Sequence, residues 1–161
     1  MLELHDHDDR DLDDLRGWFL DHPSAIRWGG PLMRWPLTPD SFEEDLKLDF
    51  VRTRVAREED GKLLAFGQYY RKLNRCHLAR IAIAPSARGR GLGRSLVQAL
   101  MTDAKEQLQL DACSLYVLAD NTPAVACYRA CGFEFAEDPE PQPALPDCLF
   151  MVAERRAVSA A

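Results

Sequence analysis

Residues 81–94 read IAIAPSARGRGLGR. The stretch passes from an apolar strand, which Pro85 stops, through glycines at positions 89, 91 and 93 into a helix. Glycine lets the backbone approach a ligand closely, and the N–H groups at the start of a helix favour an anion. Arginines at positions 88, 90 and 94 add positive charge to an acidic chain. The loop is therefore predicted to bind a phosphorylated ligand, the alternative being a loop whose glycines are purely structural.

The sequence of this loop does not match two familiar phosphate-binding motifs. A dinucleotide fingerprint that begins at Gly89 requires glycine at position 94, which is Arg94. The nucleoside-triphosphate loop ends in Gly-Lys-Ser/Thr, whereas Gly93 is followed by Arg94 here. The first glycine of that motif would also fall at position 88, where Arg88 stands. Neither nucleotide-binding class is expected.

The elements around the loop predict the fold class. The helix that follows the loop carries an apolar row, formed by Leu92, Leu96, Leu100, Ala104 and Leu108. Asp60-Gly61 is the strongest short hairpin signal in the chain. We expect helices at residues 91–109 and 121–131, and strands at 51–55, 62–71, 76–84, 112–119, 133–136 and 148–154. Strands followed by alternation of helix and strand indicate an α/β (α+β) fold with a mixed sheet.

The N-terminal third is less regular. Residues 2–4 suit a short strand, and residues 8–20 have the apolar spacing of a helix. Residues 21–39 contain many prolines and glycines and are expected to be irregular. Thr38 or Asp40 is expected to cap a further helix that carries Phe42 and Leu46.

Length and composition narrow the class of protein. The 161 residues fit one domain, 1–161, because domains commonly run about 100 to 200 residues. No apolar run is long enough to cross a bilayer, and the N-terminus lacks the order of a signal peptide, so we expect no membrane partner and a cytoplasmic location. The net charge of -6 argues against a nucleic-acid partner and mildly favours a cationic substrate.

No metal site is expected. The cysteines number five, and Cys127 and Cys131 are one helical turn apart, but they lack the tighter pairs and histidine partners of a zinc site. They are interpreted as small apolar core residues. Residues 5–9 read HDHDD and could ligate a metal, but a solvated helix entry is the preferred interpretation.

A second motif extends the first. Asn121-x-x-Ala124-x-x-x-Tyr128 leads into Gly132-Phe133. Together with Arg88-x-x-Gly91-x-Gly93, this pattern resembles the GNAT superfamily of N-acetyltransferases over roughly residues 51–135. The resemblance implies the GNAT fold, a mixed, mostly antiparallel sheet of six to seven strands flanked by about four helices. It also implies acetyl-CoA as cosubstrate.

The resemblance assigns cofactor-binding residues. The backbone of Ile81, Ala82 and Ile83 would pair with the pantetheine arm, and Asn121 would hold that arm from the opposite side. Asn121 could also simply cap its helix. The pyrophosphate would lie against Arg88, Gly89, Arg90, Gly91, Leu92, Gly93 and Arg94.

The resemblance also assigns chemistry. Tyr128 matches the general acid that protonates the departing thiolate, with a plain core tyrosine as the alternative. Some relatives carry a glutamate base five residues before the asparagine, where this chain has Tyr116, whose ordinary pKa near 10 does not suit a base. Another branch places its glutamate eleven residues before the loop. A count from Arg88, with no bulge added or lost, gives His77 as the tentative base. The alternative is an exposed histidine beside a turn.

The acceptor side is the least defined by sequence. Trp28 and Trp35 belong to an irregular stretch that is expected to line the acceptor site, unless it only packs on the core. The predicted function is acetyl-CoA-dependent N-acetylation of a primary amine, small-molecule or peptide, by direct transfer in a ternary complex. The alternative is a non-catalytic acyl-CoA sensor. Either is compatible with a monomer or a homodimer.

Overall fold

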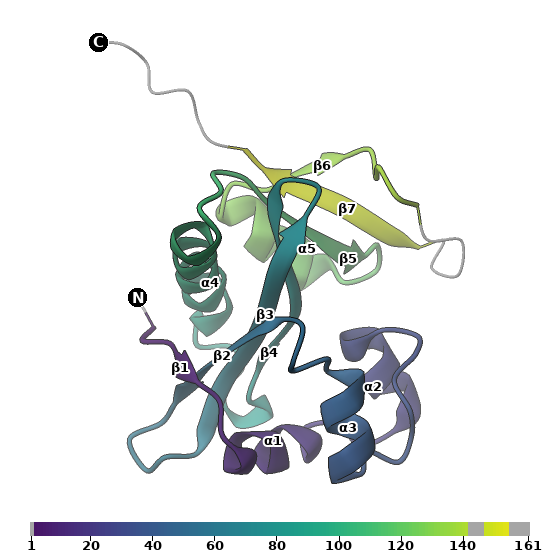
Figure 1. Ribbon diagram of the computed structural model, residues 1–161, viewed down its shortest axis with the longest axis vertical. Helices are drawn as coiled ribbons and strands as arrows, with labels where there is room; N and C mark the ends of the chain where they lie inside the picture. Colours follow the sequence, from purple (N-terminus) through teal and green to yellow (C-terminus); the bar gives the residue numbers. More distant parts are fainter. Residues whose placement is uncertain (1, 142–146, 155–161) are drawn as a thin grey trace.

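The computed structural model describes residues 2–141 and 147–154, which form a seven-stranded sheet with helices on both faces (Figure 1). The strand order is β1-β2-β3-β4-β5-β7-β6. The strands are β1 (His5–Asp6), β2 (Arg52–Arg57), β3 (Leu63–Lys72), β4 (Arg75–Ile83), β5 (Cys113–Leu118), β6 (Glu134–Ala136) and β7 (Cys148–Ala153). The helices are α1 (Asp9–Arg16), α2 (His22–Gly29), α3 (Pro39–Asp45), α4 (Leu92–Leu108) and α5 (Thr122–Ala130), with a 3₁₀ turn, η1 (Pro85–Ala87). In this part of the chain no helix is long and apolar enough to cross a membrane.

The sheet is antiparallel except at its centre, which confirms the mixed, mostly antiparallel prediction. Only β4 and β5 are parallel, and they pair over three positions, from Cys76 opposite Cys113 to Leu78 opposite Leu115. Beyond Leu78, β4 continues to Ile83 while β5 stays with β7. A gap therefore opens between the two central strands on the side where β4 enters the glycine loop.

A bulge interrupts the pairing of β4 with β3. Gln68 lies opposite Ala79 and Phe66 opposite Ala82, so the single residue between Phe66 and Gln68 faces two residues of β4. The first of these, Arg80, has a left-handed φ of 50°. A bulge of this kind bends a strand and re-aims the following side chains. The count from the loop to His77 assumed that no bulge is added or lost relative to the family pattern, and the strand that it crosses contains this bulge.

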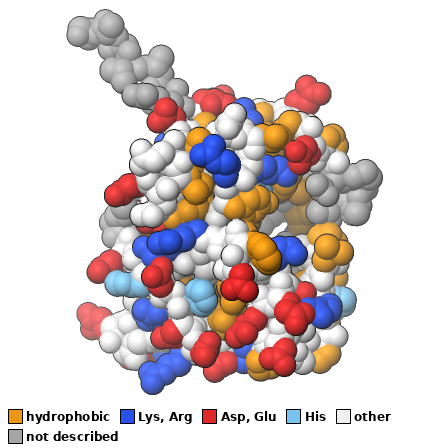
Figure 2. Space-filling view, viewed as in Figure 1, with side chains coloured by type: hydrophobic (Ala, Val, Ile, Leu, Met, Phe, Trp, Pro, Cys, Tyr) orange, Lys and Arg blue, Asp and Glu red, His pale blue; other side chains and the backbone are white. Residues whose placement is uncertain are grey.

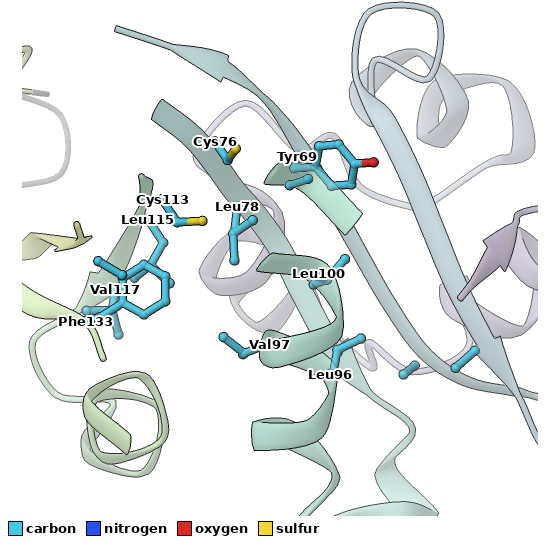
Figure 3. Packing of buried hydrophobic residues seen from close by; sticks show 14 of the residues in the cluster. Tyr69, Cys76, Leu78, Leu96, Val97, Leu100, Cys113, Leu115, Val117 and Phe133 are labelled. Carbon is cyan, nitrogen blue, oxygen red and sulfur yellow. The ribbon is translucent and has the colours of Figure 1, made fainter. Parts of the chain in front are cut away.

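Each face of the sheet carries its own hydrophobic cluster. Under α4 and α5, the α4 cluster includes Leu78, Leu96, Leu100 and Leu115, and Figure 3 shows the α4 side chains pointing toward the sheet. Under α1, α2 and α3, the α3 cluster is built from the buried residues Leu12, Leu15, Ala25, Met33, Phe42, Leu46, Val55, Leu63 and Phe66. The two faces of the sheet are thus covered by different parts of the chain.

Most elements lie where the sequence predicts them, but α2 does not. It forms within residues 21–39, which were expected to be irregular, and it brings the helices to five. Its signals are local: the Asp21 side chain accepts a 2.8 Å hydrogen bond from the Ser24 amide, Pro23 sits in the first turn, and Gly30 ends the helix at φ 104°. The prediction of an irregular segment gave more weight to the many prolines and glycines than to these helix signals. The first strand is also displaced, from residues 2–4 to β1.

Candidate functional site

The glycine loop has the geometry that a bound anion requires. Gly89 and Gly91 have φ values of 79° and 74°, and a Cβ at either position would meet no atom within 4 Å. The backbone angle, not crowding, is therefore what favours glycine there. Gly91 is the N-cap of α4, and no side chain caps that helix. The first-turn amides of α4 are consequently left for another partner.

The loop carries three arginines, one of which is already paired with a carboxylate. Within the described residues, no backbone hydrogen bond is made by the amides of Gly89, Arg90 or Gly91. The Arg90 side chain donates a 3.0 Å hydrogen bond to Glu58, on the turn that follows β2. Arg88 and Arg94 are exposed, and neither forms an ion pair in this part of the chain. Helix N-terminus, open amides and two available guanidinium groups together suit a pyrophosphate.

The other predicted cofactor residues lie on the two sides of the central gap. Ile81, Ala82 and Ile83 are half-buried and belong to the part of β4 that has left β5. Asn121 directly precedes α5, just after β5 ends, and is exposed. Its Oδ1 accepts a 3.4 Å hydrogen bond from the Ala124 amide, so the residue does cap its helix. Ligand binding by the remaining NH₂ group stays a prediction.

Tyr128 lies on α5, next to the loop. A Cβ on Gly93 would lie 3.6 Å from the Cys127 Sγ, so α5 and the start of α4 are in close contact. The Tyr128 ring packs edge-on against Phe133 at 6.1 Å, and its hydroxyl has no hydrogen-bond partner among the described residues. Burial raises the pKa of Tyr128 to about 12, so the phenol carries its proton at neutral pH. It therefore has a proton to donate.

His77 is enclosed. It is 2% exposed, its ring lies between those of Tyr70 (5.2 Å) and Tyr116 (5.0 Å), and its Nδ1 is 2.9 Å from the Ser114 Oγ. The alternative of an exposed histidine is wrong. Burial, helped by Lys72, lowers the pKa of His77 to about 4. Its role as base stays a prediction.

Because His77 is buried, we expect the stability of the folded protein to depend on pH. The unfolded chain binds a proton to this histidine near its ordinary pKa of 6.5, whereas the folded protein does so only near 4. Between these values the unfolded state holds more protons, so stability falls as the pH falls, by on the order of 3 kcal/mol in total. His77→Gln keeps a partner for Ser114 and removes this titration. Urea unfolding at pH 7 and pH 5 should show a smaller loss for the variant, and equal losses would contradict the buried neutral histidine.

The two tryptophans that were expected to line the acceptor site differ in packing and exposure. Trp28 stacks on Phe19 at 4.4 Å and on Phe42 at 6.2 Å, and its buried Nε1 has no hydrogen-bond partner in the described residues. It packs against the α3 cluster, as the structural alternative had it. Trp35 is 40% exposed and stacks against His22 at 6.2 Å. Trp35 is thus the more accessible of the two, and acceptor binding by either tryptophan stays a prediction.

Contacts across the central gap bring in residues that sequence reasoning missed. Arg27 of α2 makes a two-pronged ion pair with Asp120, before α5, at 2.8 and 3.3 Å. Half-buried Arg80 donates 3.0 Å hydrogen bonds to the Gly29 carbonyl and to the Gln68 Oε1. In Figure 2 the surface is hollowed between the part that carries β5 to β7 and the part that carries α2 and α3. The Arg27–Asp120 ion pair joins the two sides of that hollow, whereas Arg80 joins β4 to α2 and β3.

A polar cluster, Tyr116 with Lys72, Asp138 and Glu140, lies on the same face as His77. The Tyr116 hydroxyl donates a 3.2 Å hydrogen bond to the Asp138 Oδ1. The Lys72 ammonium lies 5.2 Å from the centre of the Tyr116 ring and 3.5 Å from Glu140. Asp138 and Glu140 come from the segment after β6, which no sequence motif had marked.

The acidic N-terminus serves the fold. Asp8 caps α1 in a reciprocal pair with Asp11, and Asp6 forms a 2.7 Å ion pair with Arg54. Over residues 2–141 and 147–154, no group of three or more His, Cys, Asp or Glu side chains is placed to hold a metal ion. The interpretation of this segment as a helix entry is confirmed by the capping contacts.

Comparisons with known proteins point to one family. The model of the acetyltransferase (GNAT) family matches residues 7–133. A mycothiol acetyltransferase from Salinispora tropica is 31% identical over 122 residues, covering 71% of this chain and 37% of that protein. A putative ribosomal protein bS18 alanine N-acetyltransferase from Bacillus subtilis is 29% identical over 99 residues, covering 62% of this chain and 65% of that protein. The match thus spans little more than a third of the mycothiol acetyltransferase.

Solved structures show the same fold. Spermidine N-acetyltransferase from Vibrio cholerae, in complex with CoA and spermine, superposes with a TM-score of 0.73 at 20% identity over 96% of this chain and 95% of that one. A ribosomal-protein-alanine N-acetyltransferase from Brucella melitensis gives a TM-score of 0.67 at 22% identity over 95% of this chain and 99% of that one. The fold expected from the two sequence motifs is confirmed.

Proposed function

The chain belongs to the GNAT family of acetyltransferases, and from that premise we propose that it transfers the acetyl group of acetyl-CoA directly to a primary amine. One observation carries the proposal. The uncapped start of α4, with its open amides and exposed arginines, lies at the end of a β4 edge that has separated from β5. An anion-binding loop beside an unpaired strand edge suits a long ligand with a pyrophosphate at one end and an amide-containing arm at the other.

The proposed cofactor contacts follow from this arrangement. The pyrophosphate would lie against the amides of residues 89–94, with Arg88 and Arg94 beside it. The pantetheine arm would pair with the free edge of β4 at residues 81–83, and Asn121 would reach the arm from the β5 side. The acyl end would then lie where β4 and β5 separate.

The proposed reaction has two steps, the attack of the amine on the thioester and the departure of the thiolate. The amine nitrogen attacks the thioester carbon, and the oxygen becomes an oxyanion that free strand N–H groups stabilise. The carbon–sulfur bond then breaks, and the thiolate takes the proton of the Tyr128 hydroxyl. The raised pKa of Tyr128 keeps that proton in place until the thiolate forms.

Two acceptor classes are supported. A small amine fits the acidic chain, and one solved relative is a spermidine N-acetyltransferase in complex with spermine. A peptide amine fits the relative named for alanine of a ribosomal protein. We propose the small cationic amine, because the net charge of -6 favours the approach of a cation.

An amine screen tests the function. Acetyl-CoA should be offered with spermidine, spermine, simple alkylamines and a peptide that begins with alanine, and free thiol release measured. We expect release above the rate of acetyl-CoA hydrolysis with at least one alkylamine. A protein that acetyl-CoA stabilises thermally, but that releases no thiol with any of them, would instead be an acyl-CoA sensor.

A further inference from the structure

Tyr116 lies where the two central strands separate. Leu115 is the last β5 residue that pairs with β4, so Tyr116 is the first without a β4 partner. Its ring meets the His77 ring at 5.0 Å, which places it on the sheet face opposite α4. The Tyr116 side chain is therefore at the apex of the gap, on the side from which an acceptor would approach.

A carboxylate group is hydrogen-bonded to the Tyr116 hydroxyl. The Tyr116 hydroxyl donates to the Asp138 Oδ1 at 3.2 Å, and the Glu140 amide donates to the same oxygen at 2.9 Å. Asp138 is half-buried, and none of the described cations forms an ion pair with it. Glu140, two residues on, is instead paired with Lys72 at 3.5 Å. Asp138 thus brings to the gap a negative charge that no cation of residues 2–141 and 147–154 pairs with.

We propose that Asp138 is the base of the reaction and receives the proton of the acceptor ammonium through the Tyr116 hydroxyl. The inference rests on the proposed function. An alkylamine is protonated at neutral pH and has no lone pair to attack with until it loses a proton. The ammonium N–H bond breaks as its proton passes to the Tyr116 oxygen, and the Tyr116 O–H bond breaks as its own proton passes to Asp138.

Each of the other protons in the reaction also has a donor and an acceptor. The freed amine attacks the thioester, and the thiolate that departs takes a proton from Tyr128. Tyr128 recovers a proton from the nitrogen, which has become positively charged on attack, and Asp138 releases its proton to water. Tyr116 ends each cycle as the phenol it was at the start. A relay of this kind needs no lasting phenolate, so the raised pKa that burial gives Tyr116 does not prevent it.

The groups around the pair offer no better base. His77 is buried, its Nδ1 is engaged with Ser114, and its ring packs on two tyrosines. Lys72, from β3, is a cation paired with Glu140. Cys148, from β7, and Tyr70, from β3, are the other titratable side chains near the pair, and burial and Asp138 raise the pKa of the Cys148 thiol. Asp138 is the unpaired anion of the set.

Asp138→Asn tests the proposal, with Glu140→Gln as the matched control. Both variants remove a carboxylate charge from the same segment. With the best alkylamine of the screen, we expect kcat/KM to fall by roughly 10² for Asp138→Asn, the usual loss for a missing proton acceptor. Glu140→Gln should retain most of the rate. Tyr116→Phe should lose about as much as Asp138→Asn, and the double variant no more than either, because the two act as one relay.

A weakly basic acceptor separates catalysis from structure. A hydrazide is uncharged at neutral pH and needs no base before attack, so Asp138→Asn should acetylate it at close to the wild-type rate. Equal losses with the alkylamine and the hydrazide, or an undiminished rate with the alkylamine, would overturn the assignment of Asp138 alone. Wild-type protein that acetylates no amine would overturn the proposed function as well. If Asp138→Asn fails to fold, Tyr116→Phe carries the same comparison.

Discussion

Gly91→Asp abolishes the thermal stabilisation that acetyl-CoA gives the wild-type protein. At a cofactor concentration of about 100 Kd, binding to the folded state alone stabilises by roughly 2.7 kcal/mol, a rise in Tm of several degrees. Gly91 is the N-cap of α4, and a Cβ there meets no atom within 4 Å. Aspartate is one of the few residues that visit the left-handed φ of this position, so the backbone strain of the variant is small enough for the protein to fold. The aspartate places its charge where the pyrophosphate would lie. Thermal unfolding with and without acetyl-CoA measures the effect.

Gly91→Asn is the matched control. Asparagine has the size of aspartate and also tolerates the left-handed φ of 74°. Because it adds no charge, it should keep part of the stabilisation that the aspartate removes. If Gly91→Asp shows the same rise in Tm as wild type, the loop does not bind the pyrophosphate.

Tyr128→Phe should lower the single-turnover rate with an alkylamine by roughly 10² to 10⁴, the range for a lost general acid. The change removes the hydroxyl and keeps the ring contact with Phe133. Stabilisation by acetyl-CoA should be nearly unchanged, because the hydroxyl is assigned to the departing thiolate and not to the cofactor phosphates. Since burial raises the pKa of Tyr128 to about 12, the wild-type rate should not decline on the alkaline side up to pH 10.

Tyr70→Phe provides the control for the loss of a phenol. Tyr70 is a half-buried tyrosine of β3 that packs against His77 and has no assigned role in the reaction. Its variant should keep the rate that Tyr128→Phe loses. A single-turnover rate for Tyr128→Phe equal to that of Tyr70→Phe would remove Tyr128 from the mechanism.

Local patterns predicted most of the fold. The apolar row of residues 91–109 became α4, with Gly91 and Gln109 as its caps, because the spacing of Leu92, Leu96 and Leu100 commits one helix face to the core. The Asp60-Gly61 signal became the turn between β2 and β3, with Gly61 at φ 89°. Such features depend on a few neighbouring residues, which is why they can be read from the letters alone.

The parts that could not be predicted depend on distant pairings. The Arg80 bulge arises from the register between β3 and β4, and nothing in residues 76–84 announces it. Arg27 and Asp120 are 93 residues apart, and Tyr116 and Asp138 are 22 residues apart. Such pairs form only once the sheet order has been set. The glycine loop was predictable because it is one continuous segment, whereas the contacts around the hollow come from several segments.

The two hydrophobic clusters have a consequence for how such a protein diversifies. Along β3, Ala65 and Tyr69 belong to the α4 cluster and Phe66 to the α3 cluster, while Trp18 packs against both. Substitutions that share no partner change stability additively, so the effect of a replacement beneath α1 to α3 does not depend on which residues pack beneath α4. Replacements beneath α1 to α3 can therefore accumulate over generations without compensating changes beneath α4. The two faces of one sheet can in this way diverge at different rates.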